Sequence, residues 1–279
     1  MANPTLCIYH HDCTDGFAAA WAVRKFFCGF VDFHPGIYGE DPPDVTNRSV
    51  IIADFSYKRE TLLEMATNAR RIKIFDHHKT SQEDLIDLPN NVQTVFDTTR
   101  SGSMITWQEL FIGELAPLLF HHIEDYDLHK FKLPMTAEVI AAVESYPRNF
   151  QTWNTLIEKP ILELEREGRP ILRQHKNTVD RLIEEQTRWV HFGDHPIPTA
   201  NVPHMYANDV AGRLAEGNPF AAIYYDDEHG RKWSLRSAHD GIDVSEIAKA
   251  FGGGGHKHSA GFRMTRYEAI NFERKGGAA

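Results

Sequence analysis

Short apolar runs alternate with longer helical segments over about the first 130 residues, and this alternation constrains the fold more than any other feature. Four of the runs have the length and composition of buried strands. They are Thr5–Tyr9, Ser49–Ala53, Arg71–Phe75 and Val92–Phe96. Strands separated by helices of this length favour a parallel sheet. The sequence therefore predicts an α/β domain with a parallel sheet flanked by helices on both faces.

The segments between these strands carry apolar residues at helical spacing. Residues 16–27 and 58–70 are predicted helices, and Ser56 is a candidate N-cap for the second. Residues 101–119 and 118–126 also have a helical pattern. Between residues 135 and 192 no run resembles a strand, and apolar residues from Leu172 to Val190 fall near heptad spacing. We interpret this middle part as helical, with a long amphipathic connecting helix.

The pattern changes again after Pro198. Residues 221–225 and 232–236 flank an acidic turn that ends in Gly230, which predicts a hairpin. Residues 209–215 and 244–251 are predicted helices. We therefore divide the chain into an N-terminal domain, a helical connector, a smaller α+β domain and a disordered tail. Their bounds are 1–135, 136–195, 196–275 and 275–279.

Composition excludes several classes of function. The formal charge is −9. Such a chain is poorly suited to binding long duplex nucleic acid, because affinity for the phosphates comes mainly from Lys and Arg. No apolar run approaches the ~18–20 residues of a membrane span. The first residues lack the basic and apolar segments of a secretory signal. The three cysteines have no zinc-finger spacing, so a reducing cytoplasm is the expected location.

Acidic and imidazole side chains follow three of the predicted strands. His10–Gly16 (HHDCTDG) follows the first, Asp54 the second, and Asp76-His77-His78 the third. A fourth cluster, Glu124–Asp127, lies on a predicted helix behind His121 and His122. Ligands of open parallel sheets bind outside the carboxyl ends of the strands, so these distant clusters are expected to converge there.

Each cluster alone also has an ordinary structural explanation. An aspartate after a strand, such as Asp54, is commonly a turn or cap residue, and Asp12 and Asp15 could cap the helix near Gly16. Together, however, the carboxylates would repel one another without cations. Mixed His and Asp ligation suits Mn²⁺ better than Ca²⁺, and the absence of thiolate clusters argues against structural zinc. Two ions ~3.5–4 Å apart would clamp a phosphoryl group and activate a bridging water.

At both ends the sequence resembles the DHH phosphoesterase superfamily, whose name-giving motif corresponds to Asp76-His77-His78. Residues 10–16 look like the first motif of the superfamily, Asp54 like its second, and residues 124–128 like its fourth. Residues 252–262 (GGGGHKHSAGF) are similar to the glycine-rich signature of the DHH-associated C-terminal domain. The motifs occur in the expected order along the chain.

The resemblance implies a role for each matching residue. The implied metal ligands, with Asp54 bridging two ions, are His10, Asp12, Asp15, Asp54, His77 and Asp125. Asp76 would orient an imidazole, and His78 would touch the substrate phosphate, so that Asp54, His77 and His78 form the catalytic group.

Two ligand assignments have rivals. Members of the superfamily often place the two first-motif acids one residue apart, whereas here Cys13 and Thr14 separate Asp12 from Asp15. His11 and Cys13 are therefore rival ligands, and Asp127 is a rival to Asp125.

The C-terminal domain is expected to hold a substrate phosphate. Four consecutive glycines let backbone N–H groups approach an anion, although a flexible helix end is the alternative. The predicted phosphate-binding residues there are Gly253, Gly254, Gly255, His256 and Arg236. Residues 100–103 open a predicted helix either as a second anion site or as an ordinary cap.

The resulting functional prediction is hydrolysis of short nucleotide phosphodiesters, either short oligonucleotides or cyclic (di)nucleotides, with Mn²⁺ and with Mg²⁺ or Co²⁺ as alternatives. A phosphomonoesterase or exopolyphosphatase with the same metals is one alternative function, and a non-catalytic nucleotide sensor is another. The expected partner is a small nucleotide or short oligonucleotide substrate, and neither long duplex nucleic acid nor a membrane is expected to bind. The oligomeric state, including a homodimer, stays open.

Overall fold

The structure is a computed structural model that describes residues 5–193 and 195–274. It divides into two compact units, Met1–Leu172 and Arg173–Ala279, each with its own hydrophobic core. The predicted tail and the residues considered for a secretory signal lie outside the described residues. Among the described helices, none combines the length and the apolar surface that crossing a membrane requires.

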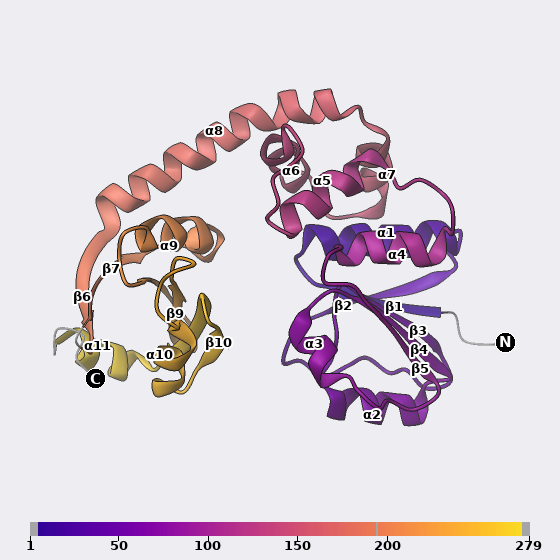
Figure 1. Ribbon diagram of the computed structural model, residues 1–279, viewed down its shortest axis with the longest axis horizontal. Coiled ribbons are helices and arrows are strands. Elements are labelled where there is room, and N and C mark those ends of the chain that lie inside the picture. The colour runs from indigo at the N-terminus through magenta and orange to yellow at the C-terminus, as the bar shows by residue number, and fades with distance from the viewer. Residues whose placement is uncertain (1–4, 194, 275–279) are drawn as a thin grey trace. The chain divides into compact units, whose positions relative to one another are not determined.

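The first unit is built on a five-stranded parallel sheet (Figure 1). Its strands, in the order β2-β1-β3-β4-β5, are β1 (Thr5–His10), β2 (Val31–Gly36), β3 (Ser49–Ala53), β4 (Arg71–Asp76) and β5 (Val92–Phe96). The predicted α/β class and four predicted strands are confirmed. Strand β2 was missed because it lies at the sheet edge, where Pro35 and polar residues are tolerated and the apolar pattern is lost.

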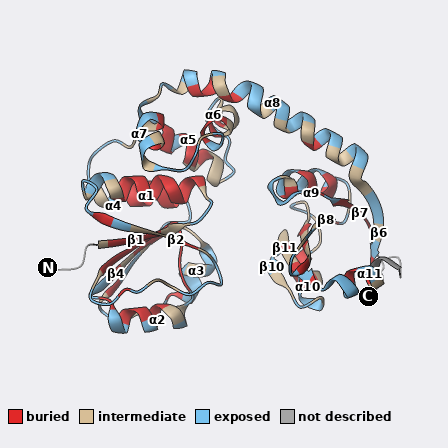
Figure 2. Ribbon diagram, turned by 180° about the vertical axis from the view of Figure 1, so that it is seen from behind, coloured by how far each residue is buried: buried red, intermediate tan, exposed pale blue. Residues whose placement is uncertain are grey.

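Helices cover both faces of this sheet (Figure 1). Helices α1 (Thr14–Phe26) and α4 (Gly102–Leu110) lie side by side on one face, and α2 (Arg59–Asn68) and α3 (Lys79–Asp84) lie on the other. Figure 2 shows that α1 is buried along most of its length, because α5 (Leu118–Asp127) and further helices cover it. Ser56 does not cap α2, whose N-cap is Lys58 without a side-chain hydrogen bond. The Ser56 hydroxyl is buried and instead donates to Asp76.

The predicted connector differs from the observed structure. Helices α6 (Thr136–Glu144) and α7 (Phe150–Glu158) belong to the core of the first unit, into which Trp153 is fully buried. The long helix α8 (Ile161–Gln186) ends before Trp189 and Val190, which lie in strand β6 (Thr187–Phe192). Strand β6 was missed because its polar and exposed residues interrupt the apolar pattern.

The second unit contains a six-stranded mixed sheet in the order β10-β11-β9-β8-β7-β6. Its further strands are β7 (His195–Asn201), β8 (Ala221–Asp227), β9 (Gly230–Arg236), β10 (Gly254–His256) and β11 (Ser259–Met264). The predicted hairpin is β8–β9. The helical elements are η1 (His204–Tyr206), α9 (Ala207–Ala215), α10 (Val244–Ala250) and α11 (Arg266–Arg274).

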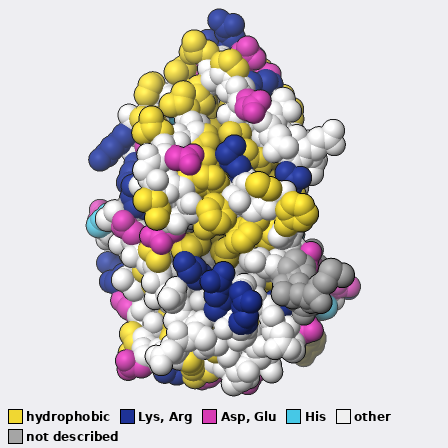
Figure 3. All heavy atoms as spheres, turned by 90° about the vertical axis from the view of Figure 1, so that its right-hand side faces the viewer, with side chains coloured by type: hydrophobic (Ala, Val, Ile, Leu, Met, Phe, Trp, Pro, Cys, Tyr) yellow, Lys and Arg dark blue, Asp and Glu magenta, His cyan; other side chains and the backbone are white. Residues whose placement is uncertain are grey.

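Exposed apolar side chains occur where α1 and α4 end. Phe30, Ile112 and Leu115 are each more than four-fifths exposed. Figure 3 looks onto the first unit from the amino ends of its strands and shows apolar side chains interspersed with Lys and Arg. The acidic and imidazole clusters follow the opposite, carboxyl ends of the strands.

Candidate metal centre

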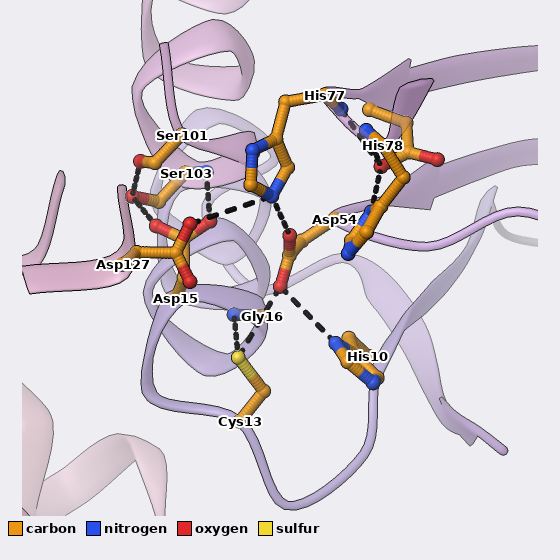
Figure 4. Close-up of polar contacts among 12 residues, drawn as sticks. His10, Cys13, Asp15, Gly16, Asp54, His77, His78, Ser101, Ser103 and Asp127 are labelled. Atoms are coloured by element: carbon orange, nitrogen blue, oxygen red, sulfur yellow. Dashed lines mark hydrogen bonds and ion pairs between the residues drawn. The ribbon is translucent and has the colours of Figure 1, made fainter. Parts of the chain in front are cut away.

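The candidate site lies where the strand order of the first unit reverses. β1 has β2 on one side and β3 on the other, and the carboxyl ends of such strands form the usual ligand crevice of an open sheet. His10 ends β1, Asp54 directly follows β3, and Asp76 ends β4 before His77 and His78. Figure 4 shows how the side chains from these strand ends turn toward one another.

Asp54 is the centre of the group and is only 1% exposed. Its Oδ1 lies 3.2 Å from His77 Nε2, and its Oδ2 lies 3.5 Å from His10 Nδ1. Asp54 has a left-handed backbone, with φ of 56°, and its N–H donates to the Phe75 carbonyl of β4. Gly102 packs directly against it, since a Cβ there would come within 2.5 Å of the Asp54 Cβ. The start of α4 can therefore approach Asp54 only because residue 102 lacks a side chain.

Asp15 and Asp127 complete the other side of the group. The buried Asp15 carboxylate accepts hydrogen bonds from the Ser103 backbone N–H at 3.0 Å and from the Ser103 hydroxyl. Asp127 Oδ2 lies 3.4 Å from His77 Nε2. The ligand atoms of Asp15, His77 and Asp127 all lie within 4.8 Å of one another. One imidazole is thus held among three carboxylates from β3, α1 and α5 (Figure 4).

Like charges at close range perturb the titration of this group. Burial and the charge of Asp54 raise the pKa of Asp15 well above its ordinary value and that of Asp127 to about 6. Burial alone would lower the pKa of His77, but the hydrogen bond and charge of Asp54 raise it to about 9. Burial would raise the pKa of Asp54, but His10 and His77 outweigh it and lower the pKa. Perturbed carboxylates that share a pocket are typical of functional sites.

The chemistry of the donor set fits divalent cations. Asp54 Oδ1 and Asp127 Oδ2 are buried, and within the described chain both face the same atom, His77 Nε2, at 3.2 and 3.4 Å without good hydrogen-bond geometry. Two buried anionic oxygens that share one imidazole nitrogen are costly in free energy. A cation would complete their coordination, and imidazole with carboxylate is a donor set that Mn²⁺ and similar ions accept.

Asp76 orients His78, and ligand atoms of both residues also lie within 4.8 Å of those of Asp54 and His77. Asp76 is fully buried and accepts from the Ser56 hydroxyl at 2.7 Å and from the His77 backbone N–H at 2.8 Å. Its Oδ1 also lies 2.6 Å from His78 Nδ1. Burial would lower the pKa of His78, but the hydrogen bond and charge of Asp76 raise it. A carboxylate that holds the proton on Nδ1 leaves Nε2 as the second functional atom of the ring.

Two residues of the predicted ligand set lie outside the group. Asp12 has a φ of 52°, and its largely exposed carboxylate pairs with Arg148. The Asp125 carboxylate accepts from the backbone N–H groups of residues 132 and 133 and from the Thr136 hydroxyl. Asp127, the rival residue, lies where the resemblance implied Asp125, because residues two apart on a helix point to different sides.

The turn before α1 differs from the sequence prediction in its helix cap and decides between the two rival ligands, His11 and Cys13. Neither Asp12 nor Asp15 caps this helix, because Cys13 is the N-cap and its Sγ accepts from the Gly16 N–H at 3.5 Å. His11 lies outside the groups of possible ligands, whereas Cys13 groups with His10 and Asp54. Residues 100–103 form an ordinary cap, in which Ser101 accepts from the Met104 N–H and Arg100 pairs with Glu124.

Parts of the chain resemble known proteins in sequence. The DHHA1 domain model matches residues 201–274. Oligoribonuclease NrnB of Bacillus subtilis is 31% identical over 113 residues, which are 39% of this chain and 25% of NrnB. An uncharacterized protein of Acanthamoeba polyphaga mimivirus is 29% identical over 286 residues, which are 92% of this chain and 67% of that protein.

Solved structures share the fold at low sequence identity. The pGpG-specific phosphodiesterase PggH of Vibrio cholerae has a TM-score of 0.57 at 14% identity, with 97% of each chain covered. RecJ of Thermus thermophilus in complex with Mn²⁺ has a TM-score of 0.54 at 14% identity, covering 99% of this chain and 52% of RecJ. The resemblance to the DHH superfamily is thus supported by the DHHA1 match over residues 201–274 and by the fold shared with these structures. The predicted enzyme class, a hydrolase of phosphate esters, agrees with the printed activities of NrnB and PggH.

The DHHA1 domain carries the predicted phosphate-binding residues. The glycine run is not an open loop, since Gly254 and Gly255 belong to β10, which pairs with β11. A Cβ on Gly253 would lie 2.2 Å from the Gly261 carbonyl oxygen, and one on Gly255 would lie 2.5 Å from the Ala260 Cα. Close strand packing thus accounts for these two glycines, and their contact with a phosphate stays a prediction.

The other two predicted residues of the DHHA1 domain have different surroundings. Arg236 donates to the Asn208 side chain at 2.6 Å and to the carbonyl of its own neighbour, Leu235. His256 is exposed. Their role toward a phosphate likewise stays a prediction.

Proposed function

We propose that this protein hydrolyses phosphodiester bonds of short nucleotides with the help of two divalent cations, Mn²⁺ first and Mg²⁺ or Co²⁺ as alternatives. The observation that carries the proposal is the buried Asp54 carboxylate, whose two oxygens face two different groups of ligand atoms. A carboxylate in this position can bridge two ions. Bound ions of this kind offset phosphate charge and lower the pKa of a coordinated water.

The geometry favours a ligand set that differs from the one implied by the sequence. Asp15, His77 and Asp127 would hold one ion and His10 would hold the other, with Asp54 shared. Asp12 and Asp125 are left out because their carboxylates already have partners outside the group. We assign His78 to the substrate: with its Nδ1 proton held by Asp76, its Nε2 is placed to hydrogen-bond to a phosphate oxygen.

A cavity in the first unit supports a nucleotide as substrate. It has a volume of about 820 Å³, and Tyr38, which is 53% exposed, lies at its edge beside the buried rings of Phe55 and Tyr57. The rest of its lining includes two basic residues, Lys58 and Arg59, and four acidic residues, Glu40, Asp41, Glu60 and Asp84. The Tyr38 ring lies 5.4 Å from the His10 ring and 6.4 Å from the His78 ring, so the cavity adjoins the metal ligands. Aromatic side chains stack on nucleobases regardless of base identity. A nucleoside could therefore bind here with its phosphate toward His78.

A second phosphate site and a cellular location are also proposed. Arg236, His256 and the glycines 253–255 of the DHHA1 domain are assigned to a second substrate phosphate. The cytoplasm is the proposed location, because the three cysteines are free thiols.

The test is turnover of a substrate panel with Mn²⁺, Mg²⁺ or Co²⁺, followed by product chromatography. A dinucleotide and a cyclic dinucleotide should yield nucleotides, whereas a phosphomonoester and polyphosphate should be poor substrates. Preference for polyphosphate or for a monoester would support the alternative enzyme function. Tight nucleotide binding without turnover would support the sensor.

A matched pair of neighbouring aspartates tests the ligand set. Asp15→Asn should lower kcat/KM for the dinucleotide by about 10²-fold or more, because a charged ligand is lost. Asp12→Asn should leave it unchanged, because Asp12 faces solvent and Asn tolerates its left-handed backbone. Equal losses in both variants would contradict the assignment.

A further inference from the structure

The sulfur of Cys13 lies against the same carboxylate as the His10 ring. Cys13 Sγ is 3.4 Å from Asp54 Oδ2, and His10 Nδ1 is 3.5 Å from that oxygen. The ligand atoms of His10, Cys13 and Asp54 all fall within 4.8 Å of one another. Figure 4 shows the sulfur and the imidazole on the side of Asp54 that faces away from His77 and Asp127.

The backbone fixes the direction of this sulfur. Cys13 is the N-cap of α1 with an extended conformation, φ −116° and ψ 136°, and Sγ accepts from the Gly16 N–H. A Cβ on Gly16 would lie 2.5 Å from the His10 carbonyl oxygen, so Gly16 lets the start of α1 pack against the end of β1. The turn therefore presents sulfur and imidazole together.

The buried carboxylate between the two groups of donors also points to cation binding. Asp54 is 1% exposed, and its Oδ2 faces the Cys13 sulfur and the His10 ring. Its Oδ1, on the His77 side, has no hydrogen bond of good geometry within the described chain. The neighbouring Asp12, which the sequence offered as the first-motif acid, points to Arg148 instead. The position expected for that carboxylate is thus occupied by a thiol.

We propose that Cys13 is a metal ligand, binding as a thiolate the ion held by His10 and Asp54. This inference rests on the two-ion site of the proposed function. On binding, the Cys13 sulfur forms a bond to the ion and the thiol proton leaves to solvent. One position then has nitrogen, sulfur and oxygen donors, and the other, at Asp15, His77 and Asp127, has only nitrogen and oxygen donors.

The two positions should therefore prefer different ions. Thiolate ligands favour soft or borderline ions such as Zn²⁺ and Co²⁺, whereas carboxylates and imidazole accept Mn²⁺. The centre would take a thiophilic ion at Cys13 and retain Mn²⁺ at the second position. The metal mixture, not only the metal concentration, would then set the state of the enzyme.

The other two cysteines provide internal controls. Cys7 lies within β1 and is fully buried in the core, and Cys28 is exposed in the turn after α1. Cys28→Ser removes the only other accessible thiol of the described chain and is the background for all variants.

The experiment is a Co²⁺ titration of the metal-free full chain, followed by the near-ultraviolet sulfur-to-cobalt charge-transfer absorption. In the Cys28→Ser background this band should grow to saturation with one ion per chain. Adding Cys13→Ser should abolish it and weaken that site by more than the about 10–100-fold typical of losing a group that only orients a ligand. A band that persists in the Cys13→Ser variant, or Co²⁺ binding to the background protein without the band, would overturn the proposal.

A second variant keeps the test informative if the Cys13→Ser protein does not fold. Cys13→Asp restores a charged ligand, so it should bind Mn²⁺ at both positions and lack the band, with the circular dichroism of the parent. In the Cys28→Ser background protein, which retains Cys13, hydrolysis with Mn²⁺ but no thiolate band with Co²⁺ would refute only the role of Cys13. A thiolate band without any hydrolysis would refute only the proposed function.

Discussion

The two units of the chain differ in whether they bury charged side chains. The first unit buries four aspartates, Asp15, Asp54, Asp76 and Asp125. In the described part of the second unit the buried polar residues are Thr199 and Ser245, which carry no charge. Its ion pairs, such as Arg213–Asp180 and Arg263–Asp227, lie at the surface.

This contrast places the candidate metal centre in the unit that buries charge. Buried carboxylates cost free energy unless hydrogen bonds or cations compensate them. Asp76 and Asp125 are compensated by several hydrogen bonds, whereas Asp54 and Asp127 each have a buried oxygen that faces only the shared imidazole of His77 within the described chain. The first unit should therefore depend on cations for activity and for part of its stability, and the second should not.

The largest expected effect comes from the same substitution made in each unit. Asp54→Asn should lower kcat/KM for a dinucleotide by about 10³-fold or more, because the bridging charge is lost. Asp227→Asn, which removes a surface ion pair, should change it by less than about twofold. Steady-state kinetics with Mn²⁺ measures both. Comparable losses would remove the functional distinction between the units.

Removing metal should destabilise only the first unit. Each ion present at 100 times its dissociation constant adds about 2.7 kcal/mol of stability to the unit that binds it. Hydrogen–deuterium exchange with and without chelator should show faster exchange in β3 and β4 and unchanged exchange in β8 and β9. Uniform acceleration in both units would show that the stabilising ions are not confined to the first.

Asp127→Asn should separate function from stability. In the metal-free protein the pKa of Asp127 is raised to about 6 by burial and by Asp54, so its charged form opposes folding at neutral pH. The neutral variant should be more stable than the parent by about 1–3 kcal/mol under these conditions. Chemical denaturation without metal measures this difference. A less stable variant would show that the carboxylate is already compensated.

The smallest expected effect is on the pH dependence of stability, which should fall in a different pH range in each unit. Raised pKa values, about 6 for Asp127 and about 9 for His77, give stability that is present at low pH and is lost as pH rises through those values. The metal-free first unit should thus weaken from about pH 4 to 9. Asp227, whose pKa is lowered to about 2 by Arg263, gives stability that is present above about pH 4 and is lost as pH falls toward 2. Hydrogen–deuterium exchange at several pH values measures both effects. A second unit that weakens as much as the first between about pH 4 and 9 would contradict the contrast.

The sequence was most informative where strand ends decide the geometry. Because β1, β3 and β4 are short apolar runs followed directly by His10, Asp54 and Asp76, their convergence follows from parallel topology alone. The edge strand β2 and the polar strand β6 could not be found this way, since neither has a continuous apolar pattern.

The sequence could not decide which of two neighbouring residues is the metal ligand, because this depends on helix rotation and backbone angles that a residue pattern does not contain. Asp125 and Asp127 are two residues apart on α5, and the rotation of that helix decides which one faces His77. Asp12 and Cys13 are adjacent, and the left-handed backbone of Asp12 turns its carboxylate outward while the sulfur turns inward. The connector was misjudged because α6 and α7 are amphipathic in the same way as a linker helix, and only packing distinguishes them.

The most direct test of the metal centre is an anomalous difference map from a crystal of the full chain grown with Mn²⁺. We expect one peak among Asp15, Asp54, His77 and Asp127, and a second about 3.5–4 Å away toward His10. Peaks bound to Asp125 or Asp12, or elsewhere in the chain while the carboxylate of Asp54 binds no ion, would contradict the account.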